Sequence, residues 1–477
     1  METVFLGFDL GSHASKGVLI SDNGTVLASN SLEHNTAMPY PGWQEQESGV
    51  WWEEFKSVSK ALLKITDLDP VEIKAVGITG FVPGLVFLDK DNSSIRPALM
   101  HTDIRAGLQL KYINSILHSP ISHGFLMPKL LWIRDNEEET YRSTSKILVP
   151  HSFIVQKLTG KYSCDRDTAA IFGGVYDNKS GNWSNAVCDK LGINIDILPE
   201  LYNSDSEVGS IGTEAAHLTG LSAGTPVITG TGDTFAALLG CGAVRSGDMM
   251  IYLGTSGTQL FIDGNIDNFI QGPHFGPGKA EFAGRIISCG DTMQHYRNIL
   301  GFQDWAFPDL KALEINPGSD GLFIFPHLKQ KTGVDFSDGD RETIFGLNSS
   351  HSNWHIYRAV MEGIAANLKT DFLAYESRVK RLILSGGGAR SRVFREIISA
   401  MLDRDIYYNP LGDGSVGVAL LAGYSITGLP LKEASLLISN SAEITWPVAG
   451  SVAVYKKNYK KYSKLRNAIE ELYKQHY

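Results

Sequence analysis

Near the start of the chain stands Phe8-Asp9-Leu10-Gly11-Ser12-His13-Ala14-Ser15-Lys16-Gly17, between the apolar runs Val4-Phe5-Leu6 and Val18-Leu19-Ile20. This pattern predicts a strand, a tight turn and a second strand. The turn offers backbone N–H groups, hydroxyls and a lysine, which suit the oxygens of a phosphate group. Asp9 beside the turn suits a hydrated Mg²⁺ held against those oxygens. The alternative for Asp9 is a hairpin residue that accepts a hydrogen bond from a neighbouring N–H.

A second element of the same kind lies in the other half of the chain, at Ile251-Tyr252-Leu253-Gly254-Thr255-Ser256-Gly257-Thr258. Taken alone, its Gly254-Thr255-Ser256-Gly257 is also an ordinary hairpin turn. Segments with strand-like and helix-like patterns alternate through the rest of the chain, which predicts an α/β fold. The repeated turn predicts two related domains that face one cleft.

The bulk composition sets limits on the class of protein. With 477 residues the chain is too long for a single core, so we expect at least two domains. Its 43% hydrophobic and 20% charged residues are ordinary for a globular protein. The net charge of −9 argues against nucleic acid or an anionic membrane as a partner.

Several kinds of site are not supported by the sequence. The four cysteines are too far apart for a zinc or redox motif, and we expect buried free thiols. Neither a P-loop motif nor a Gly-rich dinucleotide fingerprint is found. The first residues lack the basic segment of a signal peptide, and the longest apolar stretch is too short to cross a bilayer. We therefore expect a cytoplasmic protein.

An isolated carboxylate lies between the two turns, in Gly230-Thr231-Gly232-Asp233-Thr234 at the end of the predicted strand Thr225–Thr229. Glycines on both sides of a carboxylate let a ligand approach the backbone closely. In phosphoryl transfer to a hydroxyl group, such an aspartate can accept the hydroxyl proton. An equally good interpretation is that Asp233 caps the helix that follows.

Two further segments are candidates for ligand contacts. Gly386-Gly387-Gly388 follows a predicted strand and precedes a helix, which lets a nucleotide approach the backbone. Trp43-Gln44-Glu45-Gln46 joins an aromatic ring to amides and carboxylates, a combination that suits a sugar. The neighbouring Trp51 and Trp52 fit packing at the start of a helix at least as well.

The ordered set of these pieces resembles the FGGY family of carbohydrate kinases, in the wider actin, Hsp70 and hexokinase fold group. The resemblance covers essentially the whole chain and includes Thr102-Asp103-Ile104-Arg105 and Lys129-Leu130-Leu131-Trp132. It implies an α/β protein of two RNase H-like (actin-like ATPase) domains with a catalytic cleft between them. Residues 1–242 would bind the sugar and carry the catalytic Asp, and residues 243–477 would bind ATP. The resemblance also allows the last helix to pack back on the N-terminal domain, and it allows a homodimer.

The resemblance also implies roles for particular residues. Asp233 would be the general base, and Asp9 and Asp233 would lie at the Mg²⁺. The residues expected at the sugar are Trp43, Glu45, Gln46, Phe81 and Asp103. Those expected at ATP are Gly11, Ser12, Ser15, Lys16, Gly254, Thr255, Ser256, Gly386, Gly387, Gly388 and Ser391.

The departures from the family pattern lie mostly at the sugar end. Phe81-Val82-Pro83-Gly84 stands where xylulokinase-like members have Gln-Met-His-Gly, which removes a polar sugar contact and adds apolar bulk. His101-Thr102-Asp103 stands where many members have Trp-Asn-Asp, and Lys329-Gln330-Lys331-Thr332-Gly333 replaces a Ser-Gly-Glu-Arg-Thr-Pro loop. The ATP-binding segments keep the family pattern.

We therefore expect ATP- and Mg²⁺-dependent phosphorylation of a small sugar, polyol or sugar acid, with a xylulose-like ketopentose as the first candidate. Gluconate, glycerol and erythritol are alternative acceptors. Two rivals from other classes stay open: an ATPase of the same fold without a small acceptor, and a sugar-binding regulator without kinase activity.

Overall fold

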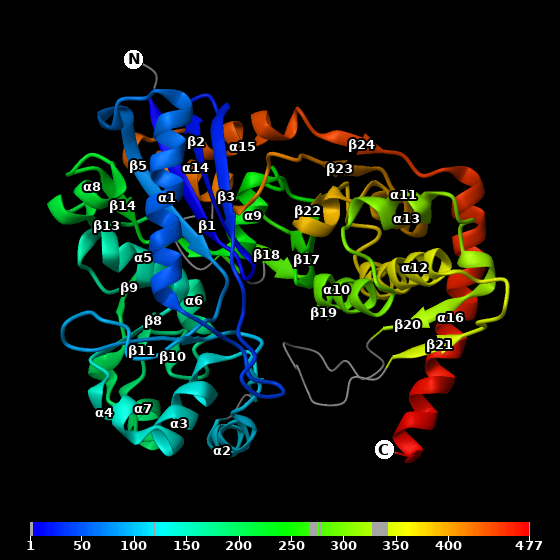
Figure 1. The fold of residues 1–477 in the computed structure, drawn as a ribbon, viewed down its shortest axis with the longest axis horizontal. Coiled ribbons are helices and arrows are strands. Elements are labelled where there is room, and N and C mark those ends of the chain that lie inside the picture. Colours follow the sequence, from blue (N-terminus) through cyan, green and yellow to red (C-terminus); the bar gives the residue numbers. More distant parts are fainter. Residues whose placement is uncertain (1–2, 118–119, 267–273, 276–277, 327–341, 477) are drawn as a thin grey trace.

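The computed structural model describes residues 3–117, 120–266, 274–275, 278–326 and 342–476. Figure 1 shows two α/β domains side by side, with the N-terminal half on the left and most of the C-terminal half on the right. Each domain is built on a seven-stranded mixed sheet. The α/β class and the two domains predicted from the sequence are confirmed.

The N-terminal sheet has the strand order β13-β14-β5-β1-β2-β3, with β15 beside β5. Strands β1 and β2 form the predicted antiparallel hairpin, and β1 runs parallel to β5. The strands are β1 (Val4–Leu10), β2 (Ala14–Ser21), β3 (Val26–Glu33), β5 (Ile73–Gly80), β13 (Glu207–Ser210), β14 (Pro226–Ile228) and β15 (Thr231–Gly232).

The C-terminal sheet repeats this arrangement, with the order β18-β17-β16-β22-β23-β24 and β19 beside β17. Strands β16 and β17 form an antiparallel hairpin, and β16 runs parallel to β22. This repeat of the β1-β2-β5 pattern confirms that the domains are related. The strands are β16 (Asp248–Leu253), β17 (Ser256–Ile262), β18 (Ala280–Phe282), β19 (Ile287–Ser288), β22 (Arg381–Ser385), β23 (Ile406–Tyr408) and β24 (Glu443–Thr445).

Helices cover the outer faces of both sheets, and small two-stranded sheets extend the domains (Figure 1). On the N-terminal side the helices are α1 (Ser48–Thr66), α2 (Gly107–Ile116), α3 (Leu126–Asn136), α4 (Glu138–Ser143), α5 (Pro150–Thr159), α6 (Arg166–Ala170), α7 (Asn185–Leu191) and α8 (Thr213–Thr219). The paired short strands there are β4 (Glu45–Gln46) with β7 (Ala98–Leu99), β6 (Val86–Leu88) with β8 (Lys146–Leu148), β9 (Ser163–Asp165) with β12 (Glu200–Tyr202), and β10 (Tyr176–Asp177) with β11 (Asn182–Trp183). On the C-terminal side are α10 (Gly290–Ile299), α11 (Ala306–Leu313), α12 (Asn353–Phe372), α13 (Arg392–Leu402), α16 (Ala449–His476), and β20 (Phe323–Phe325) with β21 (Thr343–Phe345).

Three helices, α9 (Asp233–Gly240), α14 (Gly414–Thr427) and α15 (Leu431–Ser439), belong to the apolar core between the two sheets. Helix α14 packs on β1 and β5 of the N-terminal sheet and against α9. Helix α9 in turn contacts β16 of the C-terminal sheet. Glycines make this close approach possible, because a Cβ at Gly7, Gly77, Gly240 or Gly417 would overlap the main chain of the opposing element.

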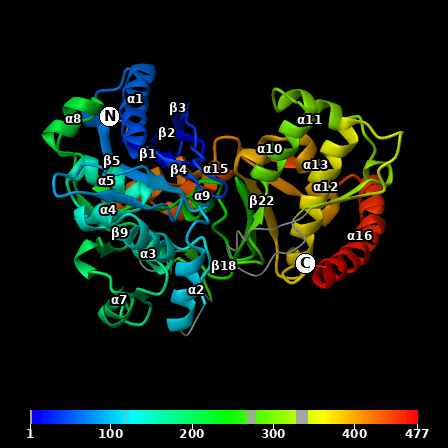
Figure 2. The ribbon, with the colours of Figure 1, turned by 60° about the horizontal axis from the view of Figure 1, so that its bottom comes forward.

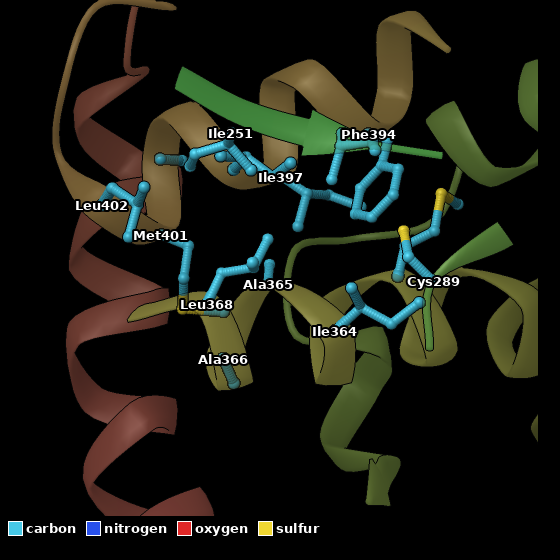
Figure 3. Close-up of a cluster of buried hydrophobic side chains, with 14 of the residues drawn as sticks. Ile251, Cys289, Ile364, Ala365, Ala366, Leu368, Phe394, Ile397, Met401 and Leu402 are labelled. Carbon is cyan, nitrogen blue, oxygen red and sulfur yellow. The ribbon is translucent and has the colours of Figure 1, made fainter. Parts of the chain in front are cut away.

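Alternating side chains on each hairpin divide between this inner core and an outer core. In β16, Met250 faces the inner core, whereas Met249, Ile251 and Leu253 join α12 and α13 in the outer core. Figure 3 shows part of that outer core, with Ile251, Ile364 and Phe394 converging from these three elements. The same period of two in β1 sends Phe5 inward and Val4, Leu6 and Phe8 outward.

The helix that returns to the N-terminal sheet is α14, and the expectation that the last helix does so is wrong. Helix α16 lies along the outer edge of the C-terminal domain (Figure 2) and packs on α13. Its Tyr455 and Tyr462 are buried in the C-terminal core, and Tyr455 donates a 2.8 Å hydrogen bond to Glu362. Among the described helices, none is long and apolar enough to cross a membrane.

We predict that Gly417→Ala destabilises the protein. The added methyl group would overlap Ala236 O and lie 2.8 Å from Gly240 N, and such overpacking typically costs about 1–3 kcal/mol. The matched control is Gly450→Ala, where a Cβ would meet nothing within 4 Å of the described atoms. Thermal unfolding should show a lower midpoint for Gly417→Ala and an unchanged or higher one for Gly450→Ala. Equal midpoints for the two variants would contradict this packing.

Candidate active site

Asp9 lies on the inner face of β1, two residues after Gly7 and next to the start of α14. The two elements approach so closely there that a Cβ on Gly414 would lie 2.8 Å from Asp9 Oδ2. The other oxygen, Oδ1, is buried and makes no hydrogen bond within the described part of the chain. Because hairpin pairing does not use this oxygen, the interpretation of Asp9 as a self-satisfied hairpin residue is wrong.

Asp413 caps the N-terminus of α14 and brings a second carboxylate to this place. Its Oδ1 accepts a 3.1 Å hydrogen bond from Ser415 N, and its Oδ2 forms an ion pair with Lys16 of β2. The sequence motif Asp413-Gly414-Ser415 reads only as a helix start, so sequence analysis missed this residue. Lys16 is paired across the junction between the two halves of the chain.

Asp233 is the first residue of α9, and the N-cap of that helix is Gly232. The interpretation of Asp233 as the cap is therefore wrong, and α9 has no side-chain capping hydrogen bond. Thr234 Oγ1 donates to Asp233 Oδ1 over 3.1 Å. Burial raises the pKa of Asp233 to about 6, although the hydrogen bond from Thr234 and the nearby His151 act to lower it. A carboxylate with a pKa near neutrality suits a general base.

The carboxylates interact electrostatically across this junction. Burial raises the pKa of Asp9 well above its ordinary value, Asp233 and Asp413 raise it further, and Lys16 lowers it. Tyr252 of β16 responds to the same charges: burial raises the pKa of its hydroxyl, and the three carboxylates add to this effect. The C-terminal sheet thus contributes a side chain to a site that is otherwise built from β1, β2, α9 and α14.

Such a concentration of negative charge fits a cation bound together with phosphate groups. Across the described residues, no group of three His, Cys, Asp or Glu side chains is placed to hold a metal ion directly. The buried Asp9 Oδ1 without a hydrogen bond therefore fits a hydrated Mg²⁺, which keeps several waters and takes few carboxylate ligands.

The Gly-rich turns predicted to contact ATP are arranged as follows. The first turn is closed by Gly11 N, which donates to Ala14 O over 2.9 Å. The second is closed by Gly254 N, which donates to Ser256 O over 3.0 Å. Gly386, with φ of +87°, packs against Leu253 O of the second turn, and a Cβ on Gly387 would meet nothing within 4 Å of the described atoms. The positions of Gly11, Ser12, Lys16, Gly254, Thr255, Ser256, Gly386, Gly387 and Gly388 are compatible with the predicted nucleotide contacts.

Two residues expected at ATP have other partners. Ser15 is fully buried and donates a 2.6 Å hydrogen bond to Glu54 of α1, so its assignment to the nucleotide is wrong. The reason is the alternation along β2, which turns Lys16 inward and its neighbour Ser15 outward. Ser391 caps α13 by accepting from Phe394 N over 3.3 Å.

On the predicted acceptor side, Asp103 and Glu45 hold an arginine. Arg105 Nη2 lies 2.7 Å from Asp103 Oδ2 and 2.8 Å from Glu45 Oε1. The guanidinium lies over the Trp43 ring at 3.8 Å and near the Trp132 ring at 5.1 Å. Asp103 is fully buried and also accepts a hydrogen bond from Gln44 N. The prediction that Asp103 contacts the sugar directly is therefore wrong, and Asp103 positions Arg105 instead.

The assignments of Gln46 and Phe81 to the sugar are also wrong, because both side chains contact other parts of the protein. Gln46 Nε2 donates to Ser12 O over 2.7 Å, and its Oε1 accepts from Trp51 Nε1 over 2.9 Å. Phe81 is buried against the Trp51 ring at a centroid distance of 5.6 Å. Gln46 therefore connects the predicted sugar segment to the first phosphate turn, and Trp51 belongs to the core.

Sequence reasoning did not assign two titratable groups near this segment. Lys129 is buried, donates to His123 O over 2.6 Å, and has a pKa lowered to about 7, chiefly by burial. His101 lies 5.7 Å from the Phe81 ring, and burial lowers its pKa to about 4. The sequence indicates a role for Lys129 and His101 only through their place in two segments that resemble the family. The segment 329–333 lies outside the described residues.

Comparisons with known proteins match both halves of the chain. Family models described as the FGGY family of carbohydrate kinases match residues 4–240 with the N-terminal domain and 249–426 with the C-terminal domain. The chain is 28% identical to the xylulose kinase of Lactococcus lactis subsp. lactis over 443 residues, which cover 88% of each chain.

Solved structures share the fold over nearly the whole chain. The xylulose kinase from Rhodospirillum rubrum has a TM-score of 0.78 and 24% identity, over 98% of this chain and 99% of that one. The gluconate kinase from Lactobacillus acidophilus has a TM-score of 0.80 and 22% identity, over 100% of each chain. The fold is the actin-like ATPase fold, and the family models define a phosphotransferase. The chain belongs to the FGGY family of carbohydrate kinases, and it is a sugar kinase.

We predict that Asp233→Asn makes the protein more stable at pH 8. The folded-state pKa of about 6 lies above the ordinary value near 3.9, so folding favours the protonated form and stability falls as pH rises through 6. Asn removes this loss, which amounts to at most about 3 kcal/mol. Thermal unfolding should show a higher midpoint at pH 8 and a difference that shrinks toward pH 4. The exposed Asp189→Asn serves as the control, and a variant no more stable than wild type at pH 8 would refute the prediction.

Proposed function

We propose that this kinase transfers the terminal phosphoryl group of Mg²⁺-ATP to a hydroxyl of a small sugar, polyol or sugar acid, with a xylulose-like ketopentose as the first acceptor. The observation that carries the proposal is the position of Asp233. This carboxylate does not cap its helix, has a pKa near 6, and lies where Asp9, Lys16 and Tyr252 meet from both domains. The xylulose kinases among the relatives support the choice of acceptor.

In this mechanism Asp233 accepts the proton of the acceptor hydroxyl as the oxygen attacks the γ-phosphorus. Lys16 and the N–H groups of the two Gly-rich turns bind phosphate oxygens and stabilise the charge that develops on them. A Mg²⁺ ion beside Asp9 would neutralise further phosphate charge when bound. Since ATP and Mg²⁺ are abundant in the cytoplasm, we propose that location for the protein.

On the acceptor side, the Asp103–Arg105–Glu45 network fixes a guanidinium against Trp43. The turn at Phe81-Val82-Pro83 is apolar where xylulokinase-like relatives have a polar one. The acceptor is therefore defined by fewer hydrogen bonds at this turn. Because of this difference, gluconate, glycerol and erythritol are also acceptors to test.

The test is ADP release with Mg²⁺-ATP across ketopentoses, pentitols, glycerol, erythritol, gluconate and hexoses. We expect strong stimulation by one compound, with a ketopentose first. Thermal stabilisation by the same compounds reports binding without turnover. Slow ADP release that no compound stimulates, together with no stabilisation by any of them, would contradict the proposal and favour an ATPase without a small acceptor.

We predict that Asp103→Asn raises the KM for the acceptor roughly 10-fold and leaves the KM for ATP unchanged. The substitution removes one charge from the pair that holds Arg105, and the loss of such a buried partner costs about 1.5–3 kcal/mol. Steady-state kinetics on the acceptor found above provide the measurement. Asp135→Asn on the neighbouring α3 is the control, because its ion pair with Arg134 is solvent-exposed and contributes little. A parallel rise in both KM values would contradict the assignment of Asp103 to the acceptor side.

A further inference from the structure

His13 lies at the tip of the turn between β1 and β2, and its backbone is firmly held. Its carbonyl accepts from His34 N over 2.9 Å, and the turn is closed by the bond from Gly11 N to Ala14 O. The His34 ring fixes this arrangement, because its nitrogens lie 3.0 Å from Glu54 Oε2 and 3.1 Å from Gly11 O. The His13 side chain itself is exposed.

The imidazole of His13 reaches across to the C-terminal domain. Its Nδ1 lies 3.4 Å from Thr255 Oγ1 in the second phosphate turn. That turn is bonded to the start of α10, where Cys289 N donates to Thr255 O over 3.0 Å. Burial raises the pKa of Asp291 in α10, and His13 lowers it, so the two groups are close.

The same imidazole also acts on the acceptor side. The pKa of His101 is lowered to about 4, mainly by burial and with smaller effects of Lys129 and His13. His13, in the first turn, is therefore close both to the second phosphate turn and to His101 on the predicted acceptor side. In the proposed function, ATP and the acceptor bind on these two sides, and the phosphoryl group moves from one to the other.

We propose that His13 is a further catalytic residue, whose imidazole donates a hydrogen bond to an oxygen of the γ-phosphoryl group during transfer. This inference rests on the proposed function. The bond from the γ-phosphorus to the β–γ bridging oxygen breaks and leaves its electron pair on ADP, while a bond forms from the acceptor oxygen to phosphorus. The hydroxyl proton goes to Asp233, and His13 keeps its own proton.

The contact with Thr255 does not by itself explain this side chain. A separation of 3.4 Å is at the long end for a hydrogen bond, and an exposed contact of this length contributes little to stability. The imidazole is therefore available to a ligand. An N–H donor aimed at developing phosphate charge in an active site has a much larger effect.

The experiment compares the binding of two nucleotides, each with Mg²⁺, by wild type and His13→Ala. We expect the affinity for a non-hydrolysable ATP analogue to fall about 5- to 10-fold, the usual effect of one hydrogen bond to a charged group. The affinity for ADP, which lacks the γ-phosphoryl group, should change less than about twofold. Acceptor-dependent kcat should fall roughly 100-fold, and His13→Gln, which keeps an N–H donor, should recover part of both losses.

The control is His217→Ala, an exposed histidine in α8 far along the chain from the turns. Equal losses for ADP and the ATP analogue in His13→Ala would indicate a structural role of the turn and overturn the proposal. Unchanged binding and unchanged kcat would overturn it as well. If wild type binds nucleotide but no acceptor stimulates ADP release, the proposed function fails, whereas the comparison of the two nucleotides still tests His13.

Discussion

The close packing of α14 on the N-terminal sheet is the constraint on which the rest of the site depends. Glycines at 7 and 77 in the sheet and at 417 in the helix remove the side chains that would hold the two elements apart. Because α14 also packs on α9, both helices begin near the end of β1. Asp413 and Asp233, at or next to these helix starts, are thereby placed close to Asp9. This close backbone packing brings segments far apart in the sequence into one site.

Bringing these carboxylates together costs electrostatic free energy, and this cost favours the binding of a cation. Three carboxylates share a partly buried space, Lys16 pairs with one of them, and one oxygen of Asp9 makes no hydrogen bond within the described structure. In the protein alone, burial and the neighbouring carboxylates oppose ionisation of Asp9, and burial opposes ionisation of Asp233. A divalent cation that binds together with phosphate groups would relieve this repulsion. The charge of the site is therefore complementary to that of its ligands and is not balanced within the protein alone.

Local pattern was enough to predict the two hairpins and the α/β class, because those features depend on neighbouring residues. The roles of Asp9 and Asp233 stay predictions. Local pattern failed where the outcome depends on partners distant in sequence. Ser15 was assigned to ATP, but its partner is Glu54 on the opposite face of β2. Asp413 was missed because only the return of α14 to the first sheet gives it a role. Asp103 and Gln46 were placed at the sugar, and their partners Arg105, Ser12 and Trp51 were visible only in the fold.

In the proposed mechanism, Asp233 acts as the base while ATP is held by other groups. The most direct test is acceptor-stimulated ADP release by Asp233→Asn, measured together with nucleotide affinity. We expect a loss of turnover of about 10²- to 10⁴-fold, with ATP bound nearly as tightly as by wild type. Near-normal turnover in this variant would contradict the assignment of Asp233. Loss of nucleotide binding in parallel with turnover would contradict the separation of base and nucleotide site.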